Sequence, residues 1–217
     1  MVINGNFFSS VASYVINLLC WLQYNSLTKI SNMKRRSFLT VPFVASALLA
    51  DAQTLTDDRP KKGFKVDKGK GRNIEGLKVL GITFDCKITS KDTNGELCIF
   101  DTIRESKGGP PLHLHYKQDE WFYVIKGEFK VQVGEEIFIL KEGDSAFGPR
   151  KIPHSFAKTS EGIGQLMVLF QPAGKMEEFF IERANLENET DPAKKEAALK
   201  TLWDRHGQKV VGPPIKV

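Results

Sequence analysis

Short apolar runs, separated by glycines at close intervals, make up the chain between residues 97 and 170. In one run, Glu120, Phe122 and Val124 alternate with Trp121 and Tyr123. Alternation with a period of two is typical of a β-strand, whose successive side chains point to opposite faces. Several such runs divided by turn residues indicate an all-β sandwich or barrel. We therefore expect a single all-β domain as the body of this 217-residue chain.

Turn signals predict how the strands connect. Asn94-Gly95 follows an apolar run from Leu77 to Phe84, which we expect to be one strand paired antiparallel with residues 97–103. Gly134-Glu135 predicts a tight hairpin, and Glu142-Gly143-Asp144 predicts the next turn.

Three of the four histidines lie between residues 113 and 154. His113 and His115 would share one face of a strand, about 6.6 Å apart along it, within reach of one metal ion. Glu120 and His154 complete a set of three imidazoles and one carboxylate, which suits a divalent transition metal. The alternative is that the histidine pair consists of solvated polar residues on an exposed strand.

The strand alternation also predicts the walls of the site. Glu120 shares its face with Phe122 and Val124, and Phe156 shares the face of His154. We therefore expect the metal to sit in an apolar pocket lined by Phe122, Val124 and Phe156.

The spacing of these residues resembles the first motif of the cupin superfamily: glycine, five residues, His-x-His, three or four residues, Glu, six residues, glycine. His113, His115, Glu120 and Gly127 fit it, whereas the opening glycine is displaced by one position, to Gly108.

The second cupin motif runs glycine, five residues, Pro-x-Gly, two residues, His, three residues, Asn. Gly143, Pro149 and His154 match it, but Lys151 replaces the second glycine and Lys158 replaces the asparagine. Neither departure removes a metal ligand.

Residues 77–186 as a whole look similar to single-domain bacterial cupins of the quercetin-dioxygenase-like kind, in particular at 109–113, 119–123 and 171–177. This resemblance implies a double-stranded β-helix, a metal at its wide end and often a homodimer. The metal would be iron, manganese, nickel, copper or zinc, between which the ligands do not discriminate.

Several functions are compatible with such a site, because a fold does not fix a function. Our first hypothesis is a metal-dependent dioxygenase-type oxidoreductase acting on a small phenolic or enolisable substrate, with Glu120 as both ligand and catalytic base. The alternatives are a non-catalytic module that binds a small sugar or phenolic ligand, and a metal-dependent isomerase or epimerase.

The N-terminal part has the features of an export signal. Arg35-Arg36, with Phe38 and Leu39, precedes an apolar stretch and the small residues around Ala52. We expect a twin-arginine signal over 33–52, starting at Met33, with residues 1–32 a non-native upstream extension and the mature protein periplasmic or extracellular. The alternative is an uncleaved membrane anchor; the mature form itself is expected to lack a stable membrane span.

Charge is concentrated after this signal. The formal net charge of the chain is +5, and lysines cluster within residues 53–76, with Phe64 as the aromatic among them. This pattern favours a charged linker over a nucleic-acid-binding surface. The barrel is then expected over 77–175.

Residues 176–217 change character and predict a C-terminal helical extension. Asp191-Pro192 is typical of a helix start, and His206-Gly207 of a helix end, which excludes His206 from the predicted ligands. Cys86 and Cys98 lie on the first two strands; a disulfide is conceivable in an exported protein, but we expect free buried thiols because their positions do not face each other directly.

Overall fold

The computed structural model describes residues 58–217. The predictions for residues 1–32 and for the export signal over 33–52 lie outside the described residues. No helix in the described part combines the length and apolarity needed to span a membrane.

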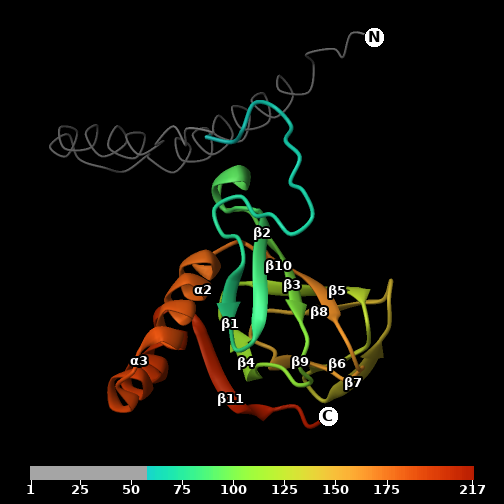
Figure 1. Cartoon of the computed structure of the whole chain (residues 1–217), viewed down its shortest axis with the longest axis vertical. Helices are drawn as coiled ribbons and strands as arrows, with labels where there is room; N and C mark the ends of the chain where they lie inside the picture. Colours follow the sequence, from blue (N-terminus) through green and yellow to red (C-terminus); the bar gives the residue numbers. More distant parts are fainter. Residues whose placement is uncertain (1–57) are drawn as a thin grey trace, which may run out of the picture. The chain divides into compact units, whose positions relative to one another are not determined.

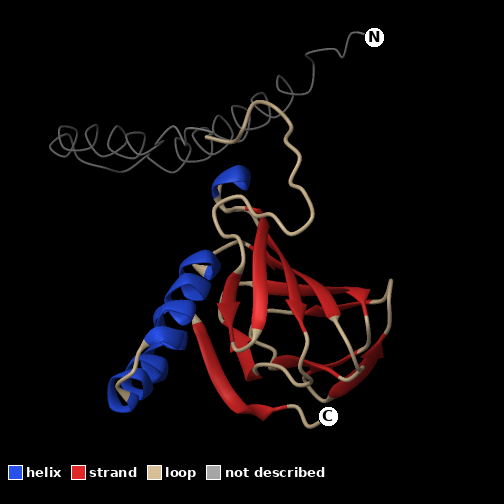
Figure 2. Cartoon of the chain, in the orientation of Figure 1, coloured by secondary structure: helices blue, strands red, loops and turns tan. Residues whose placement is uncertain are grey.

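Eleven strands in the described chain form two antiparallel sheets, and two helices lie together along one side of them (Figures 1 and 2). The six-stranded sheet has, in spatial order, β1 (Leu77–Val79), β2 (Ile82–Ile88), β3 (Cys98–Arg104), β10 (Gly164–Gln171), β5 (Asp119–Lys126) and β8 (Ser145–Gly148). The five-stranded sheet has β11 (Gln208–Pro214), β4 (Pro111–His115), β9 (His154–Lys158), β6 (Phe129–Val133) and β7 (Glu136–Leu140). The helices are α2 (Met176–Asn185) and α3 (Pro192–Arg205), and short 3₁₀ turns occupy Lys91–Thr93 and Leu186–Asn188. The expected all-β jelly roll with C-terminal helices is confirmed.

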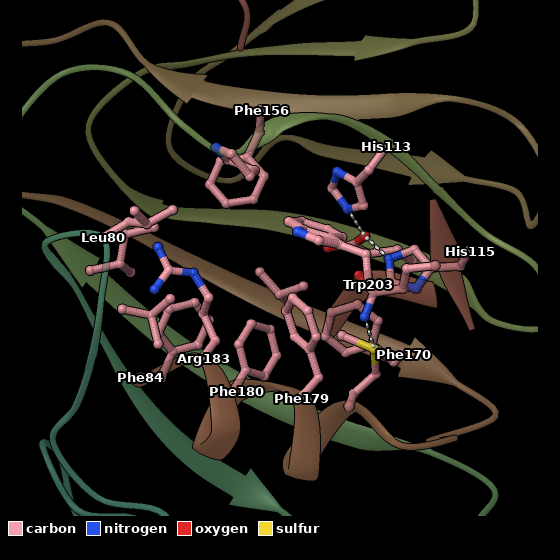
Figure 3. Close-up of a pocket in the computed structure, with 17 residues that line it drawn as sticks. Leu80, Phe84, His113, His115, Phe156, Phe170, Phe179, Phe180, Arg183 and Trp203 are labelled. Carbon is pink, nitrogen blue, oxygen red and sulfur yellow. Dashed lines mark hydrogen bonds and ion pairs between the residues drawn. The ribbon is translucent and has the colours of Figure 1, made fainter. Parts of the chain in front are cut away.

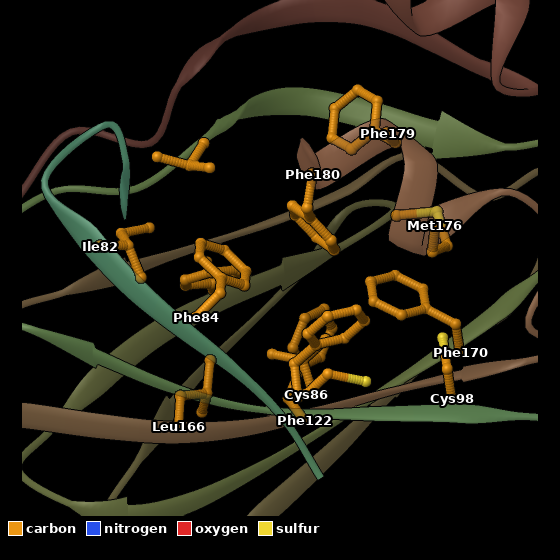
Figure 4. Close-up of a cluster of buried hydrophobic side chains, with 14 of the residues drawn as sticks. Ile82, Phe84, Cys86, Cys98, Phe122, Leu166, Phe170, Met176, Phe179 and Phe180 are labelled. Carbon is orange, nitrogen blue, oxygen red and sulfur yellow. The ribbon is translucent and has the colours of Figure 1, made fainter. Parts of the chain in front are cut away.

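The predicted alternation in β5 is confirmed. Glu120, Phe122 and Val124 are buried, whereas Trp121 and Tyr123 are half-buried on the other face. Inward-facing side chains of both sheets meet in one core, and α2 contributes to it (Figure 4). The ring centroid of Phe180 lies 4.4 Å from that of Phe84 and 4.9 Å from that of Phe100, so this helix is anchored by aromatic packing.

The first strand differs from the prediction. The run from Leu77 to Phe84 is not one strand, because it folds back at Leu80-Gly81 into the β1–β2 hairpin. Both turn residues have positive φ, 51° and 73°, which is the backbone geometry of a two-residue hairpin turn. Gly81 suits such a turn, but leucine rarely adopts this conformation, so Leu80 made a continuous strand the natural expectation.

The C-terminal segment is helical only in part. Asp191 caps α3 as expected, since its side chain accepts hydrogen bonds from the backbone of Ala193 and Lys194. Residues 208–214, however, form β11, which pairs with β4 and places Gln208 opposite His115. The expectation of a purely helical extension was incomplete, because Gly212 and the prolines of this segment are not typical of a strand. An edge strand such as β11 nevertheless tolerates glycine and proline.

Cys86 and Cys98 are free and fully buried, as predicted. Cys86 lies opposite Phe100 and Cys98 opposite Phe170 in the sheet. Burial raises the pKa of Cys86 to about 12 and raises that of Cys98 as well, so both are protonated core residues.

The end of the segment expected to be a linker contacts the barrel. Arg72 makes a bidentate pair with Asp92, with nitrogen to oxygen distances of 2.6 and 3.1 Å, and Ile74 is buried. The backbone of Cys86 donates a hydrogen bond to the carbonyl of Ile74. The segment therefore packs beside β2 just before the first strand begins.

Candidate metal centre

Three strands bring the four predicted ligands together. His113 and His115 come from β4, Glu120 from the start of β5, and His154 from the start of β9. His113 and His154 are direct cross-strand partners. All four side chains are buried, with at most 5% of their surface exposed. The positions expected from sequence spacing are therefore neighbours in space.

The ligand atoms converge on one point. Glu120 Oε2 lies 2.8 Å from His154 Nε2, 3.1 Å from His115 Nε2 and 3.8 Å from His113 Nε2. The four potential ligand atoms all lie within 4.8 Å of one another. Donor atoms bound to one ion at about 2.1 Å are separated by roughly 3 to 4 Å, so this donor set fits a single divalent metal ion.

Hydrogen bonds fix the orientation of two of the rings. The Nδ1 atoms of His113 and His154 lie 2.8 and 2.9 Å from the carbonyl oxygens of Pro111 and Ile152. A carbonyl only accepts, so each Nδ1 carries a proton and donates it. Each Nε2 is thereby directed at the centre, which is the usual arrangement of metal-binding histidines.

Electrostatics favour the ligating form of Glu120 and His113. Burial alone raises the pKa of Glu120, but its hydrogen bonds with His115 and His154 outweigh burial and lower that pKa well below its ordinary range. Burial lowers the pKa of His113 to about 3. For His154, burial acts against the charged ring, yet the hydrogen bond to Glu120 raises its pKa. An ionised carboxylate and a neutral imidazole are the forms that bind a metal.

Two turn positions support the cluster. Gly148 pairs with Glu120, and a Cβ atom there would lie 3.2 Å from Cγ and Nδ1 of the His154 ring, so the site needs a small residue. Lys151, which stands where the cupin pattern has glycine, keeps the left-handed conformation with φ 67°. Its backbone N–H donates a 2.7 Å hydrogen bond to the carbonyl of His115, which ties the turn to a ligand strand.

A cavity of about 60 Å³ adjoins the cluster (Figure 3). His113, His115 and Glu120 form part of its wall, together with Phe156, one of the three predicted lining residues. Phe122 and Val124 do not line it. They are fully buried further along β5, where they pack in the core, because alternation predicts the face of a side chain and not its depth.

Sequence reasoning missed most of the opposite wall. It comes from the β1–β2 hairpin, from both helices and from β11, and includes Leu80, Phe179, Phe180, Arg183, Trp203 and Gln208. The Trp203 ring lies 5.1 Å from the His113 ring, so α3 reaches a metal ligand directly. These segments are remote in sequence from both motifs, and no spacing rule connects them.

His206 takes no part in the cluster, in agreement with the prediction. It ends α3, where its Nδ1 lies 2.9 Å from the carbonyl of Leu202 and its Nε2 lies 3.2 Å from Glu182 Oε1.

Comparison with known proteins agrees with this geometry. Residues 102–170 match the family model of the cupin domain. An uncharacterized protein of Aquifex aeolicus is 38% identical over 61 residues, covering 28% of this chain and 50% of that protein. An uncharacterized protein of Methanocaldococcus jannaschii is 34% identical over 55 residues, covering 25% of this chain and 41% of that protein. The chain thus spans half or less of the length of these curated relatives.

Among solved structures, an RmlC-like cupin from Shewanella frigidimarina is 26% identical, with a TM-score of 0.41; the match covers 54% of this chain and 95% of that one. The family-model match, together with the two antiparallel sheets and the cluster of three histidines and one glutamate, supports placing this domain in the cupin superfamily.

Proposed function

We propose that the protein is a metal-dependent dioxygenase-type oxidoreductase that acts on a small phenolic or enolisable substrate. The observation that carries this proposal is the position of the ligand cluster in the wall of a small, mostly apolar cavity. A substrate in that cavity would contact the metal ligands on one side and apolar rings on the other. Exclusion of water from such a site strengthens every electrostatic interaction within it.

A divalent ion held by His113, His115, Glu120 and His154 would supply Lewis-acid polarisation of a substrate oxygen and, if redox-active, the means of reaction with dioxygen. Glu120 Oε2 faces the imidazoles, which leaves Oε1 to take a proton from the substrate. Such a transfer converts a phenol or enol into its anion, the form that oxidation requires.

The cavity favours this chemistry over isomerisation. Among its described lining residues, Glu120 is the only carboxylate, and neither a lysine nor a tyrosine is present. Proton transfer between two faces of a substrate usually needs a second acid or base, which this wall does not offer. The same shortage favours a non-catalytic module for a small ligand as the second candidate.

Oxygen uptake by the metal-loaded protein tests the proposal. Small enolisable and phenolic compounds are screened with iron, manganese, nickel and copper, and any active pair is repeated with Glu120→Gln. We expect this variant to keep its metal and to lose about 10²- to 10⁴-fold in turnover, because the base is removed. Glu136→Gln, an exposed carboxylate on β7, is the matched control and should retain full activity.

The outcomes separate the two candidates. Substrate-dependent oxygen uptake that Glu120→Gln abolishes supports the oxidoreductase. Ligand binding without oxygen uptake, under every metal, contradicts it and favours the binding module. Loss of both metal and turnover in Glu120→Gln would show only that the site had collapsed.

A further inference from the structure

Arg183 is a buried cation in a cavity wall that is otherwise apolar away from the ligand cluster. It projects from α2, and only 6% of its surface is exposed. Its neighbours in the lining include Leu80, Phe84 and Phe180. A guanidinium among such side chains is costly unless its charge and its N–H groups are satisfied.

The described chain satisfies Arg183 only in part. Its Nη1 forms an ion pair with Glu187 Oε1 at 2.7 Å, and no hydrogen bond of its Nε or Nη2 is found among the described residues. Glu187 is shared, because Oε1 also accepts a hydrogen bond from the Leu80 backbone and Oε2 pairs with Lys195 at 3.6 Å. One carboxylate thus divides its charge between two cations. A guanidinium offers five N–H donors, so most of its donor capacity remains for a ligand.

Figure 3 shows where this capacity is directed. The guanidinium points into the pocket beside Leu80, on the side of the view opposite His113 and His115. Leu80 is 45% exposed, so this end of the cavity is nearer to solvent. A ligand with two different ends would therefore place one at Arg183 and the other at the cluster.

The cluster end contains a second unsatisfied polar group. Gln208 lines the cavity, is fully buried and lies opposite His115 in the sheet. Its amide nitrogen contacts Met176 Sδ, while Oε1 has no hydrogen-bond partner among the described residues. A buried amide oxygen of this kind is suited to accept a hydrogen bond from a hydroxyl group.

We propose that the cavity binds a short carboxylate whose other end is an enolisable ketone or a hydroxyl group, with Arg183 pairing the carboxylate. Arg183 is then the residue that selects anionic over neutral substrates. The proposal rests on the proposed function for one assumption, that this cavity is the substrate site. The small cavity volume restricts the substrate to a short molecule.

Two probes of equal size test the role of the charge. 4-Oxopentanoate carries a ketone and a carboxylate, and 4-oxopentanamide replaces the carboxylate with a neutral amide. Their dissociation constants are measured by calorimetry with the metal-loaded full chain under nitrogen, so that no turnover occurs. We expect the acid to bind at least ~10-fold more tightly, as a charge-assisted hydrogen bond to a buried guanidinium implies.

Three variants test whether Arg183 causes the tighter binding of the acid. Arg183→Met should weaken binding of the acid to the level of the amide and leave the amide unchanged. Arg183→Lys keeps the charge without the planar donor fork and should retain part of the preference. Arg205→Met removes an exposed arginine of α3, whose side chain is 53% exposed, and should change neither constant. If Arg183→Met does not fold, Arg183→Gln, which also removes the charge, takes its place beside Arg183→Lys.

The ratio of the two dissociation constants, for the acid and for the amide, decides whether the proposal holds. Loss of the preference for the acid in Arg183→Met and its survival in Arg205→Met supports the proposal. An equal affinity of the wild type for both probes, failure of both to bind, or an unchanged preference in Arg183→Met would overturn it; the last result would assign the carboxylate to the metal. Absence of oxygen uptake with an intact preference would refute the oxidoreductase and leave the anion site standing.

Discussion

The two walls of the cavity are built from different kinds of sequence segment. One wall, the ligand face, belongs to the cluster on β4, β5 and β9: His113, His115 and Glu120 line the cavity, and His154 lies behind them, all within residues 113–154. The other, the cap, is assembled from the β1–β2 hairpin, α2, α3 and the start of β11. The ligand face follows from spacing within neighbouring strands, whereas the cap depends on segments from both ends of the domain.

The two walls therefore differ in the role that each would have in the site. Hydrogen bonds to backbone carbonyls and a carboxylate shared by three imidazoles define the ligand face, and these orient the side chains that would hold a divalent metal ion. Aromatic packing and one buried arginine define the cap, and under the proposed function these would determine which molecule can approach the metal.

The largest expected effect is on the cap. Phe180→Ala should lower the free energy of unfolding by about 3 to 5 kcal/mol, because it removes a buried ring that packs on Phe84 and Phe100. Metal content should be unchanged, since no ligand lies on α2. Chemical denaturation and elemental analysis check both. Ile181→Ala, at a 41% exposed position of the same helix, is the control and should cost less than about 1 kcal/mol.

The ligand face was the predictable wall for a physical reason. In a strand, alternate residues share a face, so the sequence alone predicts that His113 and His115 lie together. The resemblance of their spacing to the cupin motifs added Glu120 and His154. The cap lacked such regularity. Leu80 has a positive φ, which leucine rarely adopts, so the residue type does not indicate the turn. Arg183 lies among glutamates on a helix, a pattern typical of a solvated face.

An intermediate effect is expected where the β2–β3 turn holds the cap. In this turn, the Ser90 N–H donates a hydrogen bond to Glu177 of α2. Asp92, in the same turn, pairs with Arg72 of the segment that precedes β1. The Arg72 guanidinium lowers the pKa of Asp92 to about 2, with burial acting in the opposite direction. Because this pKa is lower in the folded state, the stabilisation is complete above about pH 4 and disappears as the pH falls towards 2.

Asp92→Asn should therefore lower the free energy of unfolding by about 1 to 2 kcal/mol at pH 7, a value reduced for the partial exposure of Arg72. Urea titrations at pH 7 and pH 2.5 measure the difference, which should shrink at the lower pH. A destabilisation of equal size at both values would show that the ion pair is not its cause.

The smallest expected effect is on the ligand face. Lys151 holds a left-handed φ of 67°. Lys151→Gly relieves this strain, and the gain exceeds the entropy that glycine loses on folding, so we expect stabilisation of about 0.5 to 1 kcal/mol without a change in metal affinity. Thermal unfolding of the two proteins gives the difference. A less stable glycine variant would mean that the lysine side chain itself supports the turn.

Metal content tests the central claim most directly. The chain is purified without a histidine tag or chelators and examined by elemental analysis, beside His113→Ala and the control His206→Ala, which removes the histidine outside the cluster. We predict about one equivalent of a divalent transition metal in the wild type and in His206→Ala, and its loss from a folded His113→Ala. A wild-type protein that is folded and takes up no metal on titration, or a His113→Ala variant that retains it, would contradict the assignment.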